Sequence, residues 1–102
     1  KINQFGGESP ETYGVPVEEI QKGIKNGVRK INIDTDLRLA WTAAVREIMG
    51  TKPSEFDPRT FLKPAMKAMQ DVCRDRFVSF GTAGHATKIK QIPVELYAAK
   101  YQ

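Results

Sequence analysis

Polar side chains that could bind an anionic substrate alternate with apolar ones in the stretch VRKINIDTD, residues 28–36. Lys30, Asn32 and Asp34 fall on one face of a strand with period two, and isoleucines fall on the other. An asparagine amide can donate to a developing oxyanion, and the unpaired N–H groups at the start of a helix suit a phosphate. The stretch therefore predicts a site for a phosphorylated substrate.

A polar strand face has a simpler interpretation as well, because one face of an open two-layer sheet can lie in water. Two features favour the site. Helices are predicted directly before and after the strand, and parallel strands in such folds are covered on both faces. The polar residues also continue to the carboxyl end of the strand, where α/β proteins place their sites. Asp36 keeps a second interpretation as an ordinary N-cap.

The elements that must position these residues alternate in type. Apolar residues repeat with a helical period on both sides of the strand, and Gly27 and Gly50 are predicted to end the two helices. Further on, Asp57 and Pro58 predict the N-cap and first turn of another helix, which Pro64 either kinks or restarts. We predict a strand at 28–35, helices at 16–26, 37–50, 57–80 and 93–102, and loops at 1–14 and 79–91. A strand enclosed by helices indicates the α/β class.

The third of these helices carries a row of soft apolar side chains, which we interpret as core and not as a cofactor-binding box, since methionine fills irregular gaps and a lone buried cysteine is usually inert. The row consists of Leu62, Met66, Met69, Cys73 and Phe77.

Composition limits the function classes. The chain has 102 residues, 40% of them hydrophobic, enough for one small domain. One cysteine and one histidine, Cys73 and His85, cannot complete a zinc site by themselves, so we expect no metal ligand here and interpret His85 as a solvent or interface residue.

The net charge of +4 comes from scattered basic residues, which argues against nucleic acid as a partner. The absence of a long apolar run predicts a soluble protein without membrane contact, and the lone cysteine predicts a reducing, cytoplasmic setting.

The strings GVPVEEIQKGIKNGVRKINIDTDLRLAWTAAVRE, FDPRTFLKPAMKAMQDVC and FGTAGHATKI resemble the C-terminal portion of class II, zinc-dependent fructose-1,6-bisphosphate aldolase of the Calvin-cycle-type subgroup. The resemblance implies a (β/α)8 TIM barrel, of which this chain would carry helix 7, strand 8, helix 8 and a C-terminal helical extension. In that frame residues 1–14 are a loop insertion, residues 15–50 are the last αβα unit of the barrel, and residues 51–102 are the extension.

The resemblance also implies roles for four residues. Asn32 would bind the enediolate end of dihydroxyacetone phosphate as a catalytic residue, and Asp34 and Thr35 would hold the phosphate of that substrate. Arg59, in FDPR, would reach across a subunit interface to the second phosphate of the bisphosphate; its plainer interpretation is a surface arginine at a helix start. Lys30 lies too early on the strand to form a Schiff base and is expected to be an interior ion-pair partner.

The activity implied is the reversible cleavage of fructose 1,6-bisphosphate to dihydroxyacetone phosphate and glyceraldehyde 3-phosphate, in glycolysis, gluconeogenesis or the Calvin cycle. The cofactor implied is Zn²⁺, whose histidine ligands would lie before Lys1, as would the proton-transfer aspartate. The partners implied are the rest of the barrel and further subunits of a homodimer or homotetramer. Two alternatives stay open: a tagatose-type ketose-bisphosphate aldolase, and a non-enzymatic helical interaction module. The 102 residues alone are predicted to be inactive.

Overall fold

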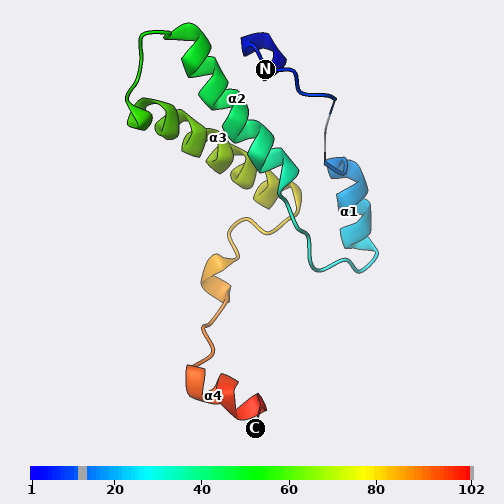
Figure 1. Cartoon of the computed structure of the whole chain (residues 1–102). Coiled ribbons are helices and arrows are strands. Elements are labelled where there is room, and N and C mark those ends of the chain that lie inside the picture. The colour runs from blue at the N-terminus through cyan, green and yellow to red at the C-terminus, as the bar shows by residue number, and fades with distance from the viewer. Residues whose placement is uncertain (12–13, 102) are drawn as a thin grey trace.

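Two long helices lie side by side and antiparallel, and they form the body of the chain (Figure 1). They are α2 (Thr35–Thr51) and α3 (Pro58–Ser79). The structure is a computed structural model that describes residues 1–11 and 14–101. Of the described residues, only Ala44 in α2 (9% exposed) and Ala65 in α3 (0% exposed) are buried. Small side chains at these positions let two helix backbones approach closely.

Helix α2 begins after Asp34 and runs through Gly50, so the prediction that Gly50 ends it is wrong. The N-terminal 3-10 turn η1 (Asn3–Phe5) packs on the C-terminal end of α2, where Gly50 lies. A Cβ atom at Gly50 would lie only 2.9 Å from Cδ1 of Phe5. The glycine therefore permits close contact with Phe5 and does not terminate the helix.

Helix α3 has the start that the sequence predicts. The side chain of Asp57 accepts a hydrogen bond from the backbone N–H of Arg59 at 2.9 Å, and Pro58 occupies the first turn, where a missing N–H costs nothing. Pro64 lies inside α3 without ending it. The predicted helix at 57–80 is thus confirmed as one continuous element.

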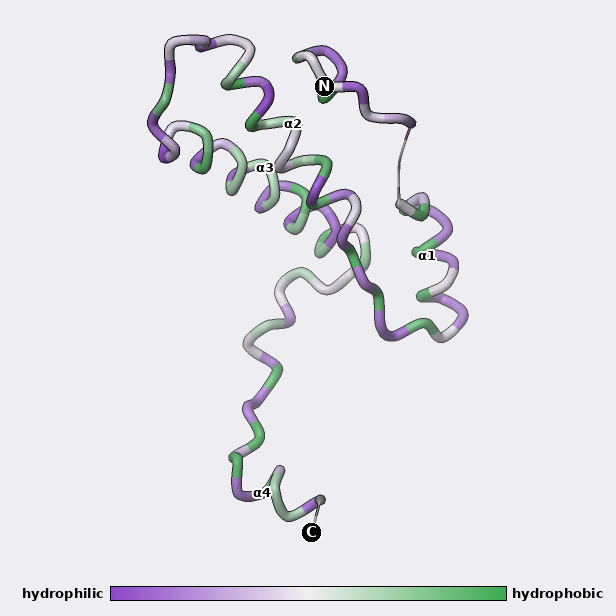
Figure 2. Tube along the Cα trace, in the orientation of Figure 1, coloured by the Kyte–Doolittle hydropathy of each residue, from purple (hydrophilic) through white to green (hydrophobic). Residues whose placement is uncertain are grey.

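The first helix, α1 (Val17–Lys25), ends just before Gly27, whose φ of +105° suits a residue without a Cβ atom. At the other end of the chain, the 3-10 turns η2 (Ala86–Lys88) and η3 (Ala99–Tyr101) flank the short helix α4 (Val94–Ala98). This segment extends away from the two long helices, and green apolar residues alternate with purple polar ones along it (Figure 2).

The predicted strand at 28–35 is not formed, and none of the described residues is in a strand. Residues 28–34 instead make an irregular connection from α1 to α2. A strand exists through hydrogen bonds to a neighbouring strand, and the described residues form no second strand to supply them. The described residues are therefore helical, which is compatible with the C-terminal part of a larger α/β protein, and the barrel itself stays a prediction.

Apolar side chains remain open to solvent over much of the chain. Its accessible surface is 8528 Å², whereas a folded monomer of 102 residues exposes about 5,800 Å². Its radius of gyration is 18.6 Å, against about 13 Å for a closed domain of this length. Met66 and Phe77, predicted as core, are 68% and 57% exposed, because the only long helix packed on α3 in the described chain is α2.

Candidate functional site

Three of the four predicted substrate-binding residues lie together at the start of α2. Asn32, Asp34 and Thr35 line a cavity of about 440 Å³, here named the α2-start cavity. Its other walls include Ile20 of α1 and Arg76 of α3. The irregular connection between α1 and α2 thus brings these residues to one place even though no strand forms.

The backbone at the start of α2 is open to an anion. Asp34 occupies the N-cap position, yet no side chain in the described part of the chain caps this helix. The carboxylate of Asp34 instead accepts a hydrogen bond from Nε of Arg38 at 2.8 Å. The first N–H groups of an α-helix have no acceptor within the helix. The N–H groups of the first turn are therefore available to a phosphate, and Arg38 offsets the charge of the neighbouring carboxylate.

Asn32 supplies the amide side chain of the cavity. It is exposed, and it makes no side-chain hydrogen bond to another residue that the structure describes. An amide of this kind can donate two hydrogen bonds to an oxygen atom of a ligand. Asn32 therefore has the chemistry of an oxyanion donor beside a phosphate site.

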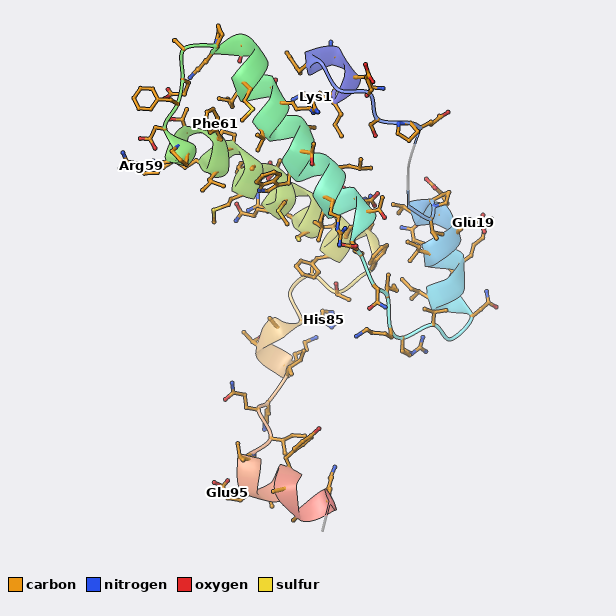
Figure 3. All side chains as sticks on the ribbon, in the orientation of Figure 1. Lys1, Glu19, Arg59, Phe61, His85 and Glu95 are labelled. Atoms are coloured by element: carbon orange, nitrogen blue, oxygen red, sulfur yellow. The ribbon has the colours of Figure 1, made fainter. Side chains whose placement is uncertain are left out.

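Arg59 lies elsewhere, at the opposite end of α3 from the loop that carries His85 (Figure 3). Arg59 and Arg76 are separated by about 25 Å along the helix axis, at a rise of about 1.5 Å per residue. The side chain of Arg59 is 83% exposed, and its Nη2 atom lies 2.6 Å from Oδ2 of Asp57. The chain therefore does not bring Arg59 to the α2-start cavity.

The pKa values of this pair are shifted by their contact. The side-chain hydrogen bond from Arg59, followed by the hydrogen bond from its backbone N–H, holds the pKa of Asp57 below the usual value of that carboxyl. The side-chain hydrogen bond to Asp57 raises the pKa of Arg59 above its usual value. Both groups are therefore fixed in their charged forms at neutral pH.

Arg76 is a residue of this region that sequence reasoning missed. Its Nη2 atom lies 3.0 Å from Oδ2 of Asp36, in the first turn of α2. The N-cap role considered for Asp36 is wrong, because Asp34 occupies that position. The two partners are 40 residues apart, so no periodic pattern within one helix signals their pairing.

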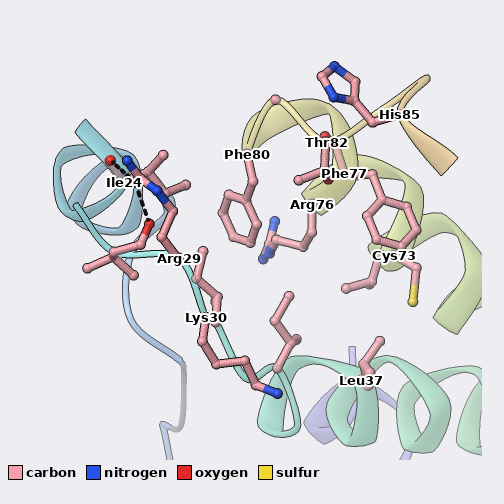
Figure 4. A pocket seen from close by; sticks show the side chains of 15 residues that line it. Ile24, Arg29, Lys30, Leu37, Cys73, Arg76, Phe77, Phe80, Thr82 and His85 are labelled. Carbon is pink, nitrogen blue, oxygen red and sulfur yellow. Dashed lines mark hydrogen bonds between the residues drawn. The ribbon is translucent and has the colours of Figure 1, made fainter. Parts of the chain in front are cut away.

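A second cavity, of about 810 Å³, lies between the α1–α2 connection and the last turns of α3 (Figure 4). Phe77 and Phe80 line it from the end of α3, and Lys30 lines it from the connection. Lys30 is exposed and has no ion pair with any described residue, which contradicts its prediction as an interior ion-pair partner. The strand that would have turned Lys30 inward is not formed. His85 is exposed at the same cavity.

The comparison with protein families identifies the chain. A model described as fructose-bisphosphate aldolase class-II matches residues 11–85, which is more than half of the 102 residues. The chain belongs to the class II fructose-bisphosphate aldolase family. The matched range contains the α2-start cavity and Arg59, and the family predicted from the three sequence strings is confirmed.

Curated relatives carry the same name. The fructose-bisphosphate aldolase of Nostoc sp. (strain PCC 7120) is 69% identical over 100 residues, and the class 2 enzyme of Synechocystis sp. is 67% identical. Each match covers 98% of this chain and 28% of the relative, so the chain spans less than a third of their length. Fructose-bisphosphate aldolase 2 of Rhodobacter capsulatus is 60% identical over 100 residues, with 88% of that relative covered.

Class II aldolases are generally metal-dependent, but the described residues hold no catalytic metal site. They contain no group of three or more His, Cys, Asp or Glu side chains that could hold a metal ion. Cys73 and His85 both line the larger cavity, but two ligands are too few for a catalytic zinc. The described residues do not fit a zinc centre.

No described helix has the length and apolar character that crossing a bilayer requires.

Proposed function

We propose that this chain supplies the substrate-phosphate part of the active site of a class II fructose-bisphosphate aldolase. The whole enzyme cleaves fructose 1,6-bisphosphate reversibly to dihydroxyacetone phosphate and glyceraldehyde 3-phosphate. The observation that carries the proposal is the gathering of Asn32, Asp34 and Thr35 at the uncapped start of α2, within the residues that match the family.

In this proposal the phosphate of dihydroxyacetone phosphate binds the N–H groups at residues 34 and 35. The helix dipole and the unpaired N–H groups favour a dianion there. The carboxylate of Asp34 would repel it, but the ion pair with Arg38 at 2.8 Å reduces that repulsion. The amide of Asn32 donates to the oxygen on which negative charge develops during carbon–carbon cleavage.

Arg59 takes a different part, the binding of the second phosphate in a neighbouring subunit. Two features support this role. The side chain of Arg59 is 83% exposed, and Arg59 lies about 25 Å along α3 from the end of the helix that borders the cavity. A residue so placed can serve the active site of a second copy but not that of its own chain, so the enzyme is proposed to be a homo-oligomer.

The zinc ion and its ligands are proposed to belong to polypeptide outside the described residues, together with the barrel strands that would pair with residues 28–35. Helix α1, the connection and α2 would then be the last αβα unit of that barrel. Residues 51–102 would form an extension that covers it and contacts a second subunit.

The experiment uses the full-length polypeptide that contains these residues. Cleavage of fructose 1,6-bisphosphate and of tagatose 1,6-bisphosphate is measured before and after treatment with a metal chelator, and again after Zn²⁺ is restored. We expect a clear preference for fructose 1,6-bisphosphate, loss of activity with the chelator, and recovery with zinc. A preference for tagatose 1,6-bisphosphate would indicate the related aldolase. Absence of cleavage of either sugar would overturn the proposal.

A further inference from the structure

We propose that Arg76 is a positioning residue for the substrate phosphate, acting through its ion pair with Asp36. This inference rests on the proposed function of the α2-start cavity. Asp36 directly follows Thr35, and Arg76, from the last turn of α3, lines the same cavity. The pair joins the first turn of α2 to α3 at the point where the phosphate is proposed to bind.

The burial of this pair distinguishes it from the other ion pairs. The side chains of Arg76 and Asp36 are 20% and 25% exposed. Every other ion pair of the described residues has at least one partner that is more than a third exposed. Water screens exposed pairs until they contribute little, whereas a pair withdrawn from water is held more firmly. The Asp36–Arg76 contact is therefore the best placed of these pairs to fix the direction in which α2 begins.

A second contact secures the other end of the same connection. Nε2 of Gln21, in α1, donates to the backbone oxygen of Ser79 at 2.8 Å in a partly buried hydrogen bond. Ser79 lies three residues after Arg76 in α3, so both contacts lie within one helical turn. The connection that carries Asn32 and Asp34 thus starts and ends at elements tied to one turn of α3.

The carboxylate of Asp36 has a second close neighbour besides Arg76. A Cβ atom on Gly14 would lie 3.2 Å from Oδ1 of Asp36, so the backbone at Gly14 passes close to this carboxylate. Gly14 and Arg76 therefore both lie beside Asp36. When the pair is broken, the first turn of α2 is free to shift, and its N–H groups lose their alignment with the phosphate. Misplacement by about 1 Å can reduce catalysis by about a hundredfold.

The test is a double-mutant cycle in the full-length enzyme, made with Arg76→Gln, Asp36→Ala and the double variant. In the condensation direction we expect each single variant to raise KM for dihydroxyacetone phosphate by about tenfold, while KM for glyceraldehyde 3-phosphate changes by less than about twofold. The double variant should be no worse than the poorer single variant, because both changes break the same contact.

The matched control is Arg74→Gln, which removes an exposed arginine two residues away on α3 and should leave both KM values unchanged. A merely structural role would lower the fraction of active enzyme, and with it the apparent kcat, without changing either KM. If Arg76→Gln does not fold, Asp36→Ala tests the same contact from the other side. If the unmutated enzyme is active and the folded variants keep an unchanged KM for dihydroxyacetone phosphate, the role proposed for Arg76 is overturned, while the proposed function of the chain stands. An unmutated enzyme without aldolase activity would overturn the proposed function, and this inference with it.

Discussion

Arg59 holds the carboxylate of Asp57 with two of its nitrogen atoms, Nε at 3.0 Å from both oxygens and Nη2 at 2.6 Å from Oδ2. The same carboxylate accepts the backbone N–H of Arg59 at 2.9 Å. One aspartate therefore caps α3 and fixes the orientation of an arginine that is 83% exposed. Such preorganisation lowers the entropic cost of binding a second anion.

The first prediction concerns Arg59→Ala in the full-length enzyme. We expect kcat/KM for fructose 1,6-bisphosphate to fall by about a hundredfold, because a guanidinium at the second phosphate is lost. The affinity for dihydroxyacetone phosphate, which lacks that phosphate, should change far less. Steady-state kinetics and ligand titration measure the two effects, and Arg74→Ala is the control. Equal losses for both ligands would show that Arg59 does not contact the second phosphate.

The second prediction concerns hybrid oligomers. When subunits with Arg59→Ala are mixed with subunits carrying Asn32→Ala, some active sites will combine an intact Asn32 with an intact Arg59 from the neighbouring copy. We expect activity above that of either parent variant. The measurement is cleavage rate in hybrids whose composition is verified by mass. Lack of rescue would place Arg59 in the active site of its own chain.

The third prediction concerns Asn32→Ala. Removal of an oxyanion donor typically costs at least about a hundredfold in kcat, and we expect a loss of that size with little change in zinc content. The control is Asn26→Ala, since Asn26 donates to the backbone oxygen of Lys22 at the end of α1 and lies outside the cavity. Near-normal turnover of the Asn32 variant would refute its catalytic role.

The fourth prediction follows from the lowered pKa of Asp57. A carboxyl whose pKa is lower in the folded state stabilises that state above its unfolded pKa, and the stabilisation is lost as the pH falls through the folded pKa. We therefore expect Asp57→Asn to lower the urea midpoint of the enzyme at pH of about 6, with a smaller difference from the unmutated enzyme at pH of about 3. A difference that stays constant across this range would contradict the assigned contact.

The helices were predictable from the sequence because their determinants are local. The apolar period of α2, the pairing of Asp57 with Pro58 at the start of α3, and Gly27 after α1 each act within a few residues. The strand predicted at 28–35 does not form. The alternation of polar and apolar residues there indicates which side chains would share a face of a strand, but a strand also needs a neighbouring strand as hydrogen-bonding partner.

Part of the candidate site was likewise predictable from local sequence, and part was not. Asn32, Asp34 and Thr35 are close in sequence and line one cavity, and their roles at the substrate stay predictions. The Asp36–Arg76 pair depends on how α3 packs against α2, and nothing local to either residue specifies that packing. Gly50 misled the prediction for a related reason, because its role is set by the distant Phe5.

The fifth prediction concerns the 102 residues as a free chain. Only Ala44 and Ala65 are buried among the described residues, and Phe77 and Met66 are more than half exposed. Such a chain keeps helical structure without a packed core. We expect helical far-UV circular dichroism, a weak near-UV signal, a broad thermal transition and no aldolase activity. A sharp transition with dispersed amide resonances in a monomer would favour an independent helical module.

The central claim, that residues 32–35 form the phosphate end of the active site, is tested most directly by a crystal structure of the full-length enzyme with dihydroxyacetone phosphate. We predict phosphate oxygens about 2.7 to 3.2 Å from the backbone nitrogens of residues 34 and 35. Asn32 should lie within the same range of the oxygen at the reacting end of the ligand. A phosphate bound away from the start of α2, with Asn32 making no contact to the ligand, would contradict the claim.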